Sequence, residues 1–273
     1  MARIQSLAVL SSASGNDYLA EQYGAVIANV QKNGIASRIK NTALSGTPTA
    51  GTVEAKRFAN RTSNAYGTAR SGHAGQKVTA TPVVIPINVD KELITEVEQK
   101  DVSLYGVDAF IEKQAAMDEK AMVRELERAF WAEANTAGSA VTLNGTTEEE
   151  KAEEMIQSVE TVSNTFVDGV ERDMITLVLA PAKFGALRTY MDKVQDGGAH
   201  GEEIGYFHGV RVESSVYLPS GVNYVAIADG AIAQPVLPTV APAQKIPLSN
   251  AYAFGMFYSY GTKAVAPDLI FKA

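Results

Sequence analysis

The sequence lacks cysteine and has only three histidines among its 273 residues. Without cysteine the chain can form no disulfide, thiolate metal site or iron–sulfur cluster, and it has no thiol nucleophile. The histidines, His73, His200 and His208, are too few for the histidine-rich zinc hydrolase patterns and for most histidine-dependent proton relays. We therefore expect no metal and no cofactor.

Enzyme motifs and long apolar runs are also missing. The sequence contains neither a Gly-x-x-x-x-Gly-Lys-[Ser/Thr] phosphate loop nor a Gly-x-Ser-x-Gly nucleophile motif. No stretch approaches the roughly 20 apolar residues of a membrane helix, and the first residues are too mixed for a signal peptide. We expect a chain made and used in a cytoplasm, with no membrane partner. Carboxylates such as Asp192 or Glu202 keep a soluble enzyme open as an alternative.

Charge is divided unevenly along the chain, whose net charge is −7. Residues 1–80 have a net charge of +6, residues 90–173 a net charge of −13, and residues 174–273 a net charge of zero. Such an asymmetry suggests that the basic part of one copy lies on the acidic surface of another. A solvated acidic face explains the same numbers equally well.

A long hairpin is predicted from two extended stretches, 53–60 and 77–89, around a tip of Gly, Ala, Ser and Thr. Pro82 and Pro86 cannot donate to a ladder, so the returning strand lies at a sheet edge. A hairpin of this length buries little surface and needs something to lie against, the alternative being a mobile surface loop.

Two helices are predicted in the first half of the chain. Residues 108–134 contain no Gly or Pro and are rich in Ala, Glu, Lys, Met and Leu, which predicts a helix of about seven turns. Its apolar residues spread around the axis, which indicates contacts on several sides. Residues 17–33 predict an amphipathic helix, and residues 42–52 a linker without periodicity.

A second domain is predicted to begin after Gly138. Thr146 and Glu149 have the spacing of a capping box, and Asp168-Gly169 would stop the helix that they open. The remaining elements begin with a buried strand at 174–180, a helix opened by Pro181 at 181–191 and a glycine-rich loop at 196–201. Strands at 208–218 and 224–235 and a proline-rich crossing at 235–247 follow. Two final strands close the chain, the first with alternating aromatic residues at 251–261 and the second at 263–272.

The order of these parts resembles the major capsid proteins of tailed bacteriophages, which have the α+β Hong Kong 97-type fold. The most specific local piece is Gly205–Ser215 with Leu218-Pro219, which looks like the "hGv.V..s..lP" strand of that family. The passage from VVIPINVDKEL into the long helix is similar to the family's succession of hairpin, peripheral domain and spine helix. The resemblance covers essentially the whole chain.

The resemblance implies four parts. Residues 1–50 would be an N-terminal arm and residues 51–89 an extended E-loop. Residues 90–140 with 242–273 would form a peripheral domain with the spine helix, and residues 141–241 an axial domain.

The resemblance also implies a function. It predicts a structural, non-enzymatic protein that assembles into hexamers and pentamers of an icosahedral head around double-stranded DNA, located in the virion capsid after assembly in the host bacterial cytoplasm. An encapsulin-like shell around a cargo is the alternative within this fold. The implied partners are further copies of the chain, a portal, packaged DNA held non-specifically at the inner face, and a scaffolding protein. The scaffolding protein is expected to be separate because only about 50 residues precede the hairpin, and a decoration protein stays open.

On this interpretation the basic residues of the hairpin become candidate intersubunit contacts, with the acidic region 90–173 as their counter-surface. The candidates are Lys56, Arg57, Arg61, Arg70 and Lys77. Some family members crosslink a lysine of this loop to a neighbour's asparagine, for which Asn250 is the candidate acceptor here.

Overall fold

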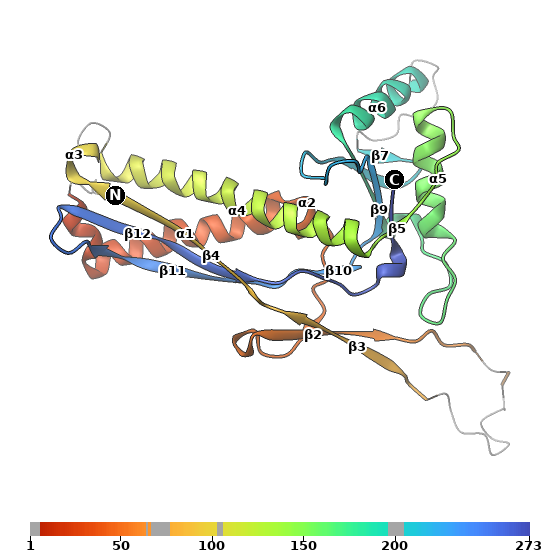
Figure 1. Ribbon diagram of the computed structural model, residues 1–273, viewed down its shortest axis with the longest axis horizontal. Helices are drawn as coiled ribbons and strands as arrows, with labels where there is room; N and C mark the ends of the chain where they lie inside the picture. The colour runs from red at the N-terminus through yellow and green to blue at the C-terminus, as the bar shows by residue number, and fades with distance from the viewer. Residues whose placement is uncertain (1–5, 64, 67–76, 103–105, 196–204) are drawn as a thin grey trace. The chain divides into compact units, whose positions relative to one another are not determined.

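The chain folds as two units, each with its own core (Figure 1). The computed structural model describes residues 6–63, 65–66, 77–102, 106–195 and 205–273. Unit 1 comprises Met1–Arg38, Ile87–Ala129 and Pro235–Gly261, and unit 2 comprises Ile39–Pro86, Phe130–Gln234 and Thr262–Ala273. Residues 196–204, which hold the predicted glycine-rich loop, lie outside the described residues.

Unit 1 is built from long helices and one antiparallel sheet of order β11-β12-β4. The helices are α1 (Ala13–Asn33), α2 (Ile35–Ile39, whose last residue belongs to unit 2), α3 (Gln99–Val102) and α4 (Val107–Ala137, which continues into unit 2). The strands are β4 (Val89–Glu98), β11 (Val236–Lys245) and β12 (Ala251–Tyr260), and a 3-10 turn, η1 (Leu7–Ser11), precedes α1.

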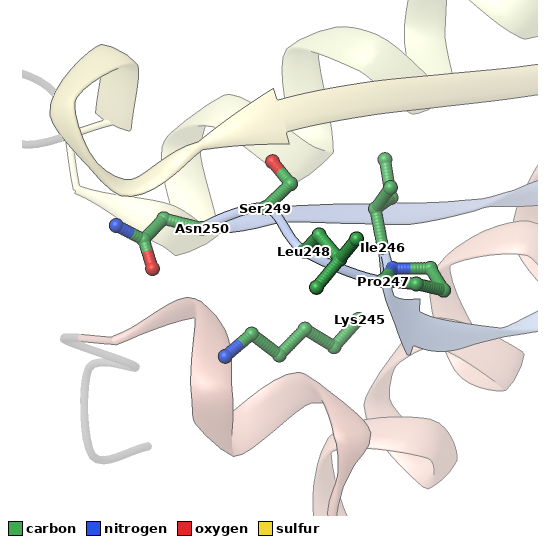
Figure 2. Close-up of a pocket in the computed structure, with 6 residues that line it drawn as sticks. All are labelled: Lys245, Ile246, Pro247, Leu248, Ser249 and Asn250. Carbon is green, nitrogen blue, oxygen red and sulfur yellow. The ribbon is translucent and has the colours of Figure 1, made fainter.

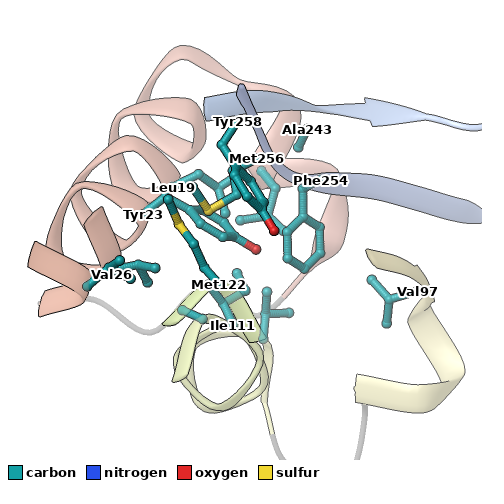
Figure 3. Packing of buried hydrophobic residues seen from close by; sticks show 14 of the residues in the cluster. Leu19, Tyr23, Val26, Val97, Ile111, Met122, Ala243, Phe254, Met256 and Tyr258 are labelled. Atoms are coloured by element: carbon teal, nitrogen blue, oxygen red, sulfur yellow. The ribbon is translucent and has the colours of Figure 1, made fainter. Parts of the chain in front are cut away.

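The core of unit 1 confirms the predicted apolar face of the first helix. Leu19 and Tyr23 of α1 lie among residues of α4 and of the sheet, with Met256 of β12 close by (Figure 3). Every second residue of β12 from Phe254 to Tyr260 is buried, as its alternation predicted. Full burial of one such side chain contributes about 1.5–3 kcal/mol to folding, so this shared cluster holds the helices on the sheet.

The long helix is confirmed over 107–137. In line with the predicted contacts on several sides, one face packs on the core of unit 1, and Glu127 is buried on another side, where it accepts a hydrogen bond from the backbone N–H of Ala36. The fully buried positions of the core face recur every three or four residues and include the carboxylate of Asp118: Val107, Ile111, Ala115, Asp118, Met122 and Leu126. This spacing covers one helix face. Met117, outside that face, is 56% exposed.

Two strands of this sheet differ from expectation. The proline-rich crossing is the strand β11, which tolerates Pro238 and Pro242 because it is an edge strand and its register shifts between Ala241 and Gln244. The other edge strand, β4, was not predicted because its residues outside the core are charged. Burial on one face only is enough to hold such a strand in a sheet.

Asp118 is a buried carboxylate that ties α4 to α1. It accepts hydrogen bonds from the Tyr23 hydroxyl (3.1 Å) and from Nε2 of Gln114 (3.1 Å). Burial raises the pKa of Asp118, and these two hydrogen bonds lower it only in part. The ionised form is therefore less favourable in the folded chain than in the unfolded chain.

Asp118→Asn should stabilise the unassembled chain more at pH 7 than at pH 4. Because the folded pKa is raised, wild-type stability is lost as the pH rises from the unfolded pKa through the folded pKa, whereas asparagine does not titrate. The free energy gained on substitution should therefore be larger at pH 7 than at pH 4. Urea unfolding of both proteins at the two pH values measures it, and a difference that shrinks with rising pH would contradict the assignment.

Unit 2 contains two separate sheets and a short pair of strands. The first sheet has the order β1-β2-β3 and is formed by β1 (Leu44–Ser45), β2 (Thr52–Phe58) and β3 (Ala80–Pro86). The second has the order β5-β14-β9-β6-β8-β7, with β5 (Ser139–Ala140), β14 (Ile270–Lys272), β9 (Tyr224–Ala228), β6 (Ile175–Leu179), β8 (Val210–Ser214) and β7 (Tyr206–Phe207). The pair is β10 (Ile232–Ala233) with β13 (Lys263–Ala264).

Helices α5 (Glu148–Glu160) and α6 (Pro181–Gln195) complete unit 2, together with 3-10 turns η2 (Pro48–Ala50), η4 (Arg172–Met174) and η5 (Pro267–Leu269). The apolar face of α5 packs on the larger sheet through Ala152, Met155, Ile156 and Val159. Both the buried strand β6 and the helix opened by Pro181 confirm their predictions.

Three details of unit 2 correct the sequence analysis. The capping box is formed by Thr147 and Glu150, one residue later than predicted. The helix ends at Glu160, because the Asn164 side chain accepts from the following backbone N–H groups and starts a turn. The strand predicted over 208–218 ends at Ser214, and Val216 is 72% exposed.

Candidate assembly surfaces

The predicted hairpin is confirmed as the antiparallel pair β2 and β3, with β3 at the edge of its sheet. Residues that pair across the ladder point to the same face. One face holds Val53, Ala55 and Ile85, which are at most 3% exposed. The opposite side, called the outer hairpin face below, consists entirely of exposed residues: Thr52, Glu54, Lys56 and Phe58 of β2, with Ala80, Pro82, Val84 and Pro86 of β3.

The tip-side end of strand β2 is tied to distant parts of unit 2. The Arg57 guanidinium makes a bidentate ion pair with Asp268, with both N–O distances at 2.5 Å, and lies 4.3 Å from the centre of the Phe166 ring. Asp268 also accepts from Nδ2 of Asn164, and the backbone N–H of Asn60 donates to Thr165. Burial alone would raise the pKa of Asp268, but the bonds from Arg57 and Asn164 outweigh it and the pKa is lowered.

The five predicted contact residues therefore differ in exposure and in the face on which they lie. Lys56, Arg61 and Lys77 are exposed, and Lys56 lies on the outer hairpin face. Arg57 points to the other side, and its side chain is 15% exposed in the ion pair with Asp268 of the same chain. Arg70 lies outside the described residues. For all of these residues the intersubunit role stays a prediction.

The acidic region 90–173 is not one surface in the structure, and its role as the counter-surface of basic groups stays a prediction. Its clearest acidic row is on β4, where alternate residues face away from the core of unit 1: Asp90, Glu92, Glu96 and Glu98. Phe257 of β12 and Ile94 of β4 lie on the same side of the sheet and are 45% and 38% exposed. We call this side the acidic sheet face. Helix α4 exposes side chains of both signs, with Glu112 and four cations among them.

A second group of carboxylates surrounds α5 in unit 2. Arg172 contacts Glu153 at 2.6 Å and Glu160 at 3.0 Å, and Nδ1 of His208 lies 3.0 Å from Glu153. Hydrogen bonds from Arg172 lower the pKa of Glu153 to about 2. The sequence analysis found no such neighbour for His208, because Glu153 is 55 residues away. A carboxylate held ionised in this way is a poor general acid at neutral pH.

The chemistry of an enzyme finds little support in the described residues. Among them, no group of three or more His, Asp or Glu side chains has the arrangement of a metal site. Likewise, no described helix is long and apolar enough to cross a membrane. The side chain of Asp192 and the whole of Glu202 lie outside the described residues, so the carboxylate prediction stays open there.

A shallow pocket at the β11–β12 turn is lined by residues of that turn alone (Figure 2). Leu248 is fully exposed at its tip with a left-handed backbone (φ 60°), and Asn250 stands beside it. The pocket has no carboxylate or histidine in its lining, which runs from Lys245 to Asn250. The role of Asn250 as a crosslink acceptor stays a prediction.

Comparison with known proteins gives one consistent result. No family model matches the sequence, and no curated protein matches it. Solved structures do match. A virus-like particle from Pyrococcus furiosus has a TM-score of 0.60 at 14% identity, over 94% of this chain and 99% of that chain.

Two phage structures match in the same way. Mycobacterium phage Che8 has a TM-score of 0.58 at 18% identity, over 81% of this chain and 84% of that chain. The mature capsid of bacteriophage PhiM1 has a TM-score of 0.56 at 14% identity, over 88% and 86% of the two chains.

The chain has the Hong Kong 97-type fold. The match extends over most of this chain and of each of these structures, so the predicted α+β fold class and its resemblance are confirmed at the level of the fold. The assignment of the hairpin as an E-loop and of the long helix as a spine helix stays a prediction.

Proposed function

We propose that this protein is a shell-forming structural protein, the major capsid protein of a tailed phage, which assembles into hexamers and pentamers around double-stranded DNA. The observation that carries the proposal is the outer hairpin face. Phe58 is 57% and Val84 50% exposed there, on a hairpin too thin to bury them itself. Neighbouring exposed apolar groups of this kind mark an interaction surface.

A second copy of the chain supplies the complementary surface. The acidic sheet face presents a row of carboxylates beside exposed apolar groups, Phe257 and Ile94. The outer hairpin face likewise combines apolar residues with charge, and its Lys56 ammonium, beside Glu54, is the group that can meet those carboxylates. Apolar contact then supplies the attraction, while opposite charges set the register and disfavour wrong pairings.

The tie between Arg57 and Asp268 fits this role. A hairpin that binds a neighbour must keep its direction before binding, because freedom that is lost on association weakens the contact. The bidentate ion pair fixes the end of β2 against η5 within unit 2. Arg57 thus positions the hairpin, while Lys56, Arg61, Arg70 and Lys77 are proposed to contact the neighbour.

The finer assignments belong to the same proposal. We assign residues 1–50 to the N-terminal arm, 51–89 to the E-loop, 90–140 with 242–273 to the peripheral domain, and 141–241 to the axial domain. A separate scaffolding protein, a portal and non-specifically held DNA are the expected partners, with a decoration protein as a further one. The protein acts in the virion after assembly in the bacterial cytoplasm, and it catalyses no reaction.

Purified protein should form capsomers or megadalton particles rather than remain a 29.1 kDa monomer. Many weak contacts between copies add up to a stable shell through their number. Size-exclusion chromatography followed by negative-stain microscopy tests this, with and without co-expressed scaffolding protein. A monomer under every condition would overturn the proposal.

A cargo-enclosing shell is the second candidate, because the match to the virus-like particle from Pyrococcus furiosus covers 94% of this chain. The contents of nuclease-treated particles distinguish the two. Protected double-stranded DNA supports the phage head, and an enclosed protein without nucleic acid supports the cargo shell.

A further inference from the structure

The solvent side of α4 carries a row of cations. Lys113, Lys120, Arg124 and Arg128 are all exposed and follow one another at spacings of seven, four and four residues. At 3.6 residues per turn these intervals keep the four side chains on one face of the helix. We call this row, with the exposed Met117 between its members, the basic stripe.

The four cations lack direct partners among the described residues of the chain, although Arg128 is one of the charges that lower the pKa of Glu125. None of them has an ion pair or a hydrogen bond from its side chain there, whereas Lys91, Lys151, Arg172 and Lys183 each have one. The stripe belongs to the segment 90–173, whose net charge is −13. Four neighbouring cations without ion pairs create a local positive potential, which the nearby carboxylates of Glu125 and Glu127 offset only in part.

The shape of the stripe favours a long anion over a protein. The other exposed positions on this side are small, Ala109 and Ala116, so that a partner can approach the helix closely. The cations span about 22 Å along the axis, a length over which duplex DNA presents a regular series of phosphates. Protein interfaces instead concentrate aromatic anchors and are depleted in lysine, and the stripe has lysines and no aromatic residue.

We propose that the basic stripe of α4 binds the phosphate backbone of double-stranded nucleic acid, without reading its sequence. This inference rests on the proposed shell function and adds to it the surface that faces the enclosed DNA. Exposed lysine and arginine side chains contact phosphates by charge and by hydrogen bonds, and they release counterions on binding. Each subunit of a shell would contribute one stripe, so weak individual contacts add up over the inner surface.

The test is binding of full-length unassembled protein to a random-sequence DNA duplex of about 30 base pairs, measured over a range of salt concentrations. Wild type should bind weakly, with a steep salt dependence. The variant Lys113→Gln/Lys120→Gln/Arg124→Gln/Arg128→Gln should lose at least tenfold in affinity at low salt. Its slope of log K against log salt should be smaller by about 0.9 for each contact removed, up to about 3.6.

A charge-matched variant separates the stripe from net charge. Lys32, Arg188, Lys245 and Lys263 are exposed cations elsewhere on the chain, and their replacement by glutamine also removes four positive charges. This control should keep most of the wild-type affinity and slope. Equal losses in both variants, or no loss in the stripe variant, would overturn the proposal.

Polyglutamate of similar length serves as the competing probe for an acidic protein partner. Stripe-dependent binding of polyglutamate as tight as that of the duplex would overturn the assignment to nucleic acid. Particle formation is scored separately by microscopy. Stripe-variant particles that form normally but protect less DNA would support the inference. If wild type forms no particles, the shell function is contradicted. The duplex-binding measurement still tests the basic stripe in that case.

Discussion

Replacing both Phe58 and Val84 by aspartate should abolish particle formation and leave the fold of the single chain intact. Each side chain is half exposed or more in the chain alone, so its loss costs the monomer little. In the assembly each would be buried against a neighbour, a contribution of about 1.5–3 kcal/mol per fully buried apolar side chain. The aspartates would also face carboxylates of the acidic sheet face.

Two further variants separate the apolar contact from charge repulsion. Phe58→Leu/Val84→Ile keeps an apolar surface and should assemble. Phe58→Ser/Val84→Ser removes the apolar surface without adding charge and should be as defective as the aspartate variant. Microscopy and circular dichroism are the readouts. Normal particles from the aspartate or the serine variant, with a native spectrum, would show that this face makes no essential contact.

Sequence patterns predicted the elements whose formation depends on residues close together in the chain. The long helix follows from 27 residues without Gly or Pro in 108–134, and its structure extends over 107–137. The alternation in 251–260 predicted a strand with one buried face. Proline placed β3 at a sheet edge, because Pro82 and Pro86 lack the N–H that an inner strand needs.

The features that sequence missed depend on partners distant along the chain. Strand β4 is held by its pairing with β12, which lies more than 150 residues later, and its charged residues gave no apolar pattern. Arg57 was grouped with Lys56 as a free basic residue, but its partner Asp268 is 211 residues away. The alternation of side chains along β2 was a signal that could have separated these two neighbours, since they must point to opposite faces.

The net charge of the segment 90–173 likewise did not predict which of its charged side chains share a surface. Net charge over 90–173 suggested an acidic counter-surface, but a sum along the chain says nothing about the direction of each side chain. Helix periodicity places Asp118 on the core face of α4, Glu127 is buried where it accepts from Ala36 of α2, and four cations stay exposed. Accessible carboxylates lie on β4, around α5 and on α4 itself, so only the structure shows which of them share a surface.

Gly255→Ala should unfold unit 1 or destabilise it by about 3–5 kcal/mol, the largest effect of any single methyl group considered for this chain. Gly255 lies in the central strand β12 with a φ of +154°, and a Cβ there would stand 2.0 Å from the Leu93 carbonyl oxygen of β4. No side chain can move to relieve this clash, because the obstacle is backbone. The pairing of β12 with β4 must open, which exposes the core that α1 and α4 share with the sheet.

Gly24→Ala is the matched control, because it adds the same methyl group in the same unit. Gly24 lies in α1, and a Cβ there meets nothing within 4 Å. Alanine should stabilise this helix by about 0.5–1 kcal/mol through its higher helix propensity. Urea unfolding of the unassembled chains, followed by far-ultraviolet circular dichroism, compares the two. Equal stability of the Gly255→Ala chain and wild type would mean that β12 and β4 do not pair as closely as described.

Strands β12 and β4 carry both the shared core and the acidic sheet face. Gly255→Ala should therefore also remove the surface on which a neighbour's hairpin is proposed to dock, whereas Gly24→Ala should assemble normally.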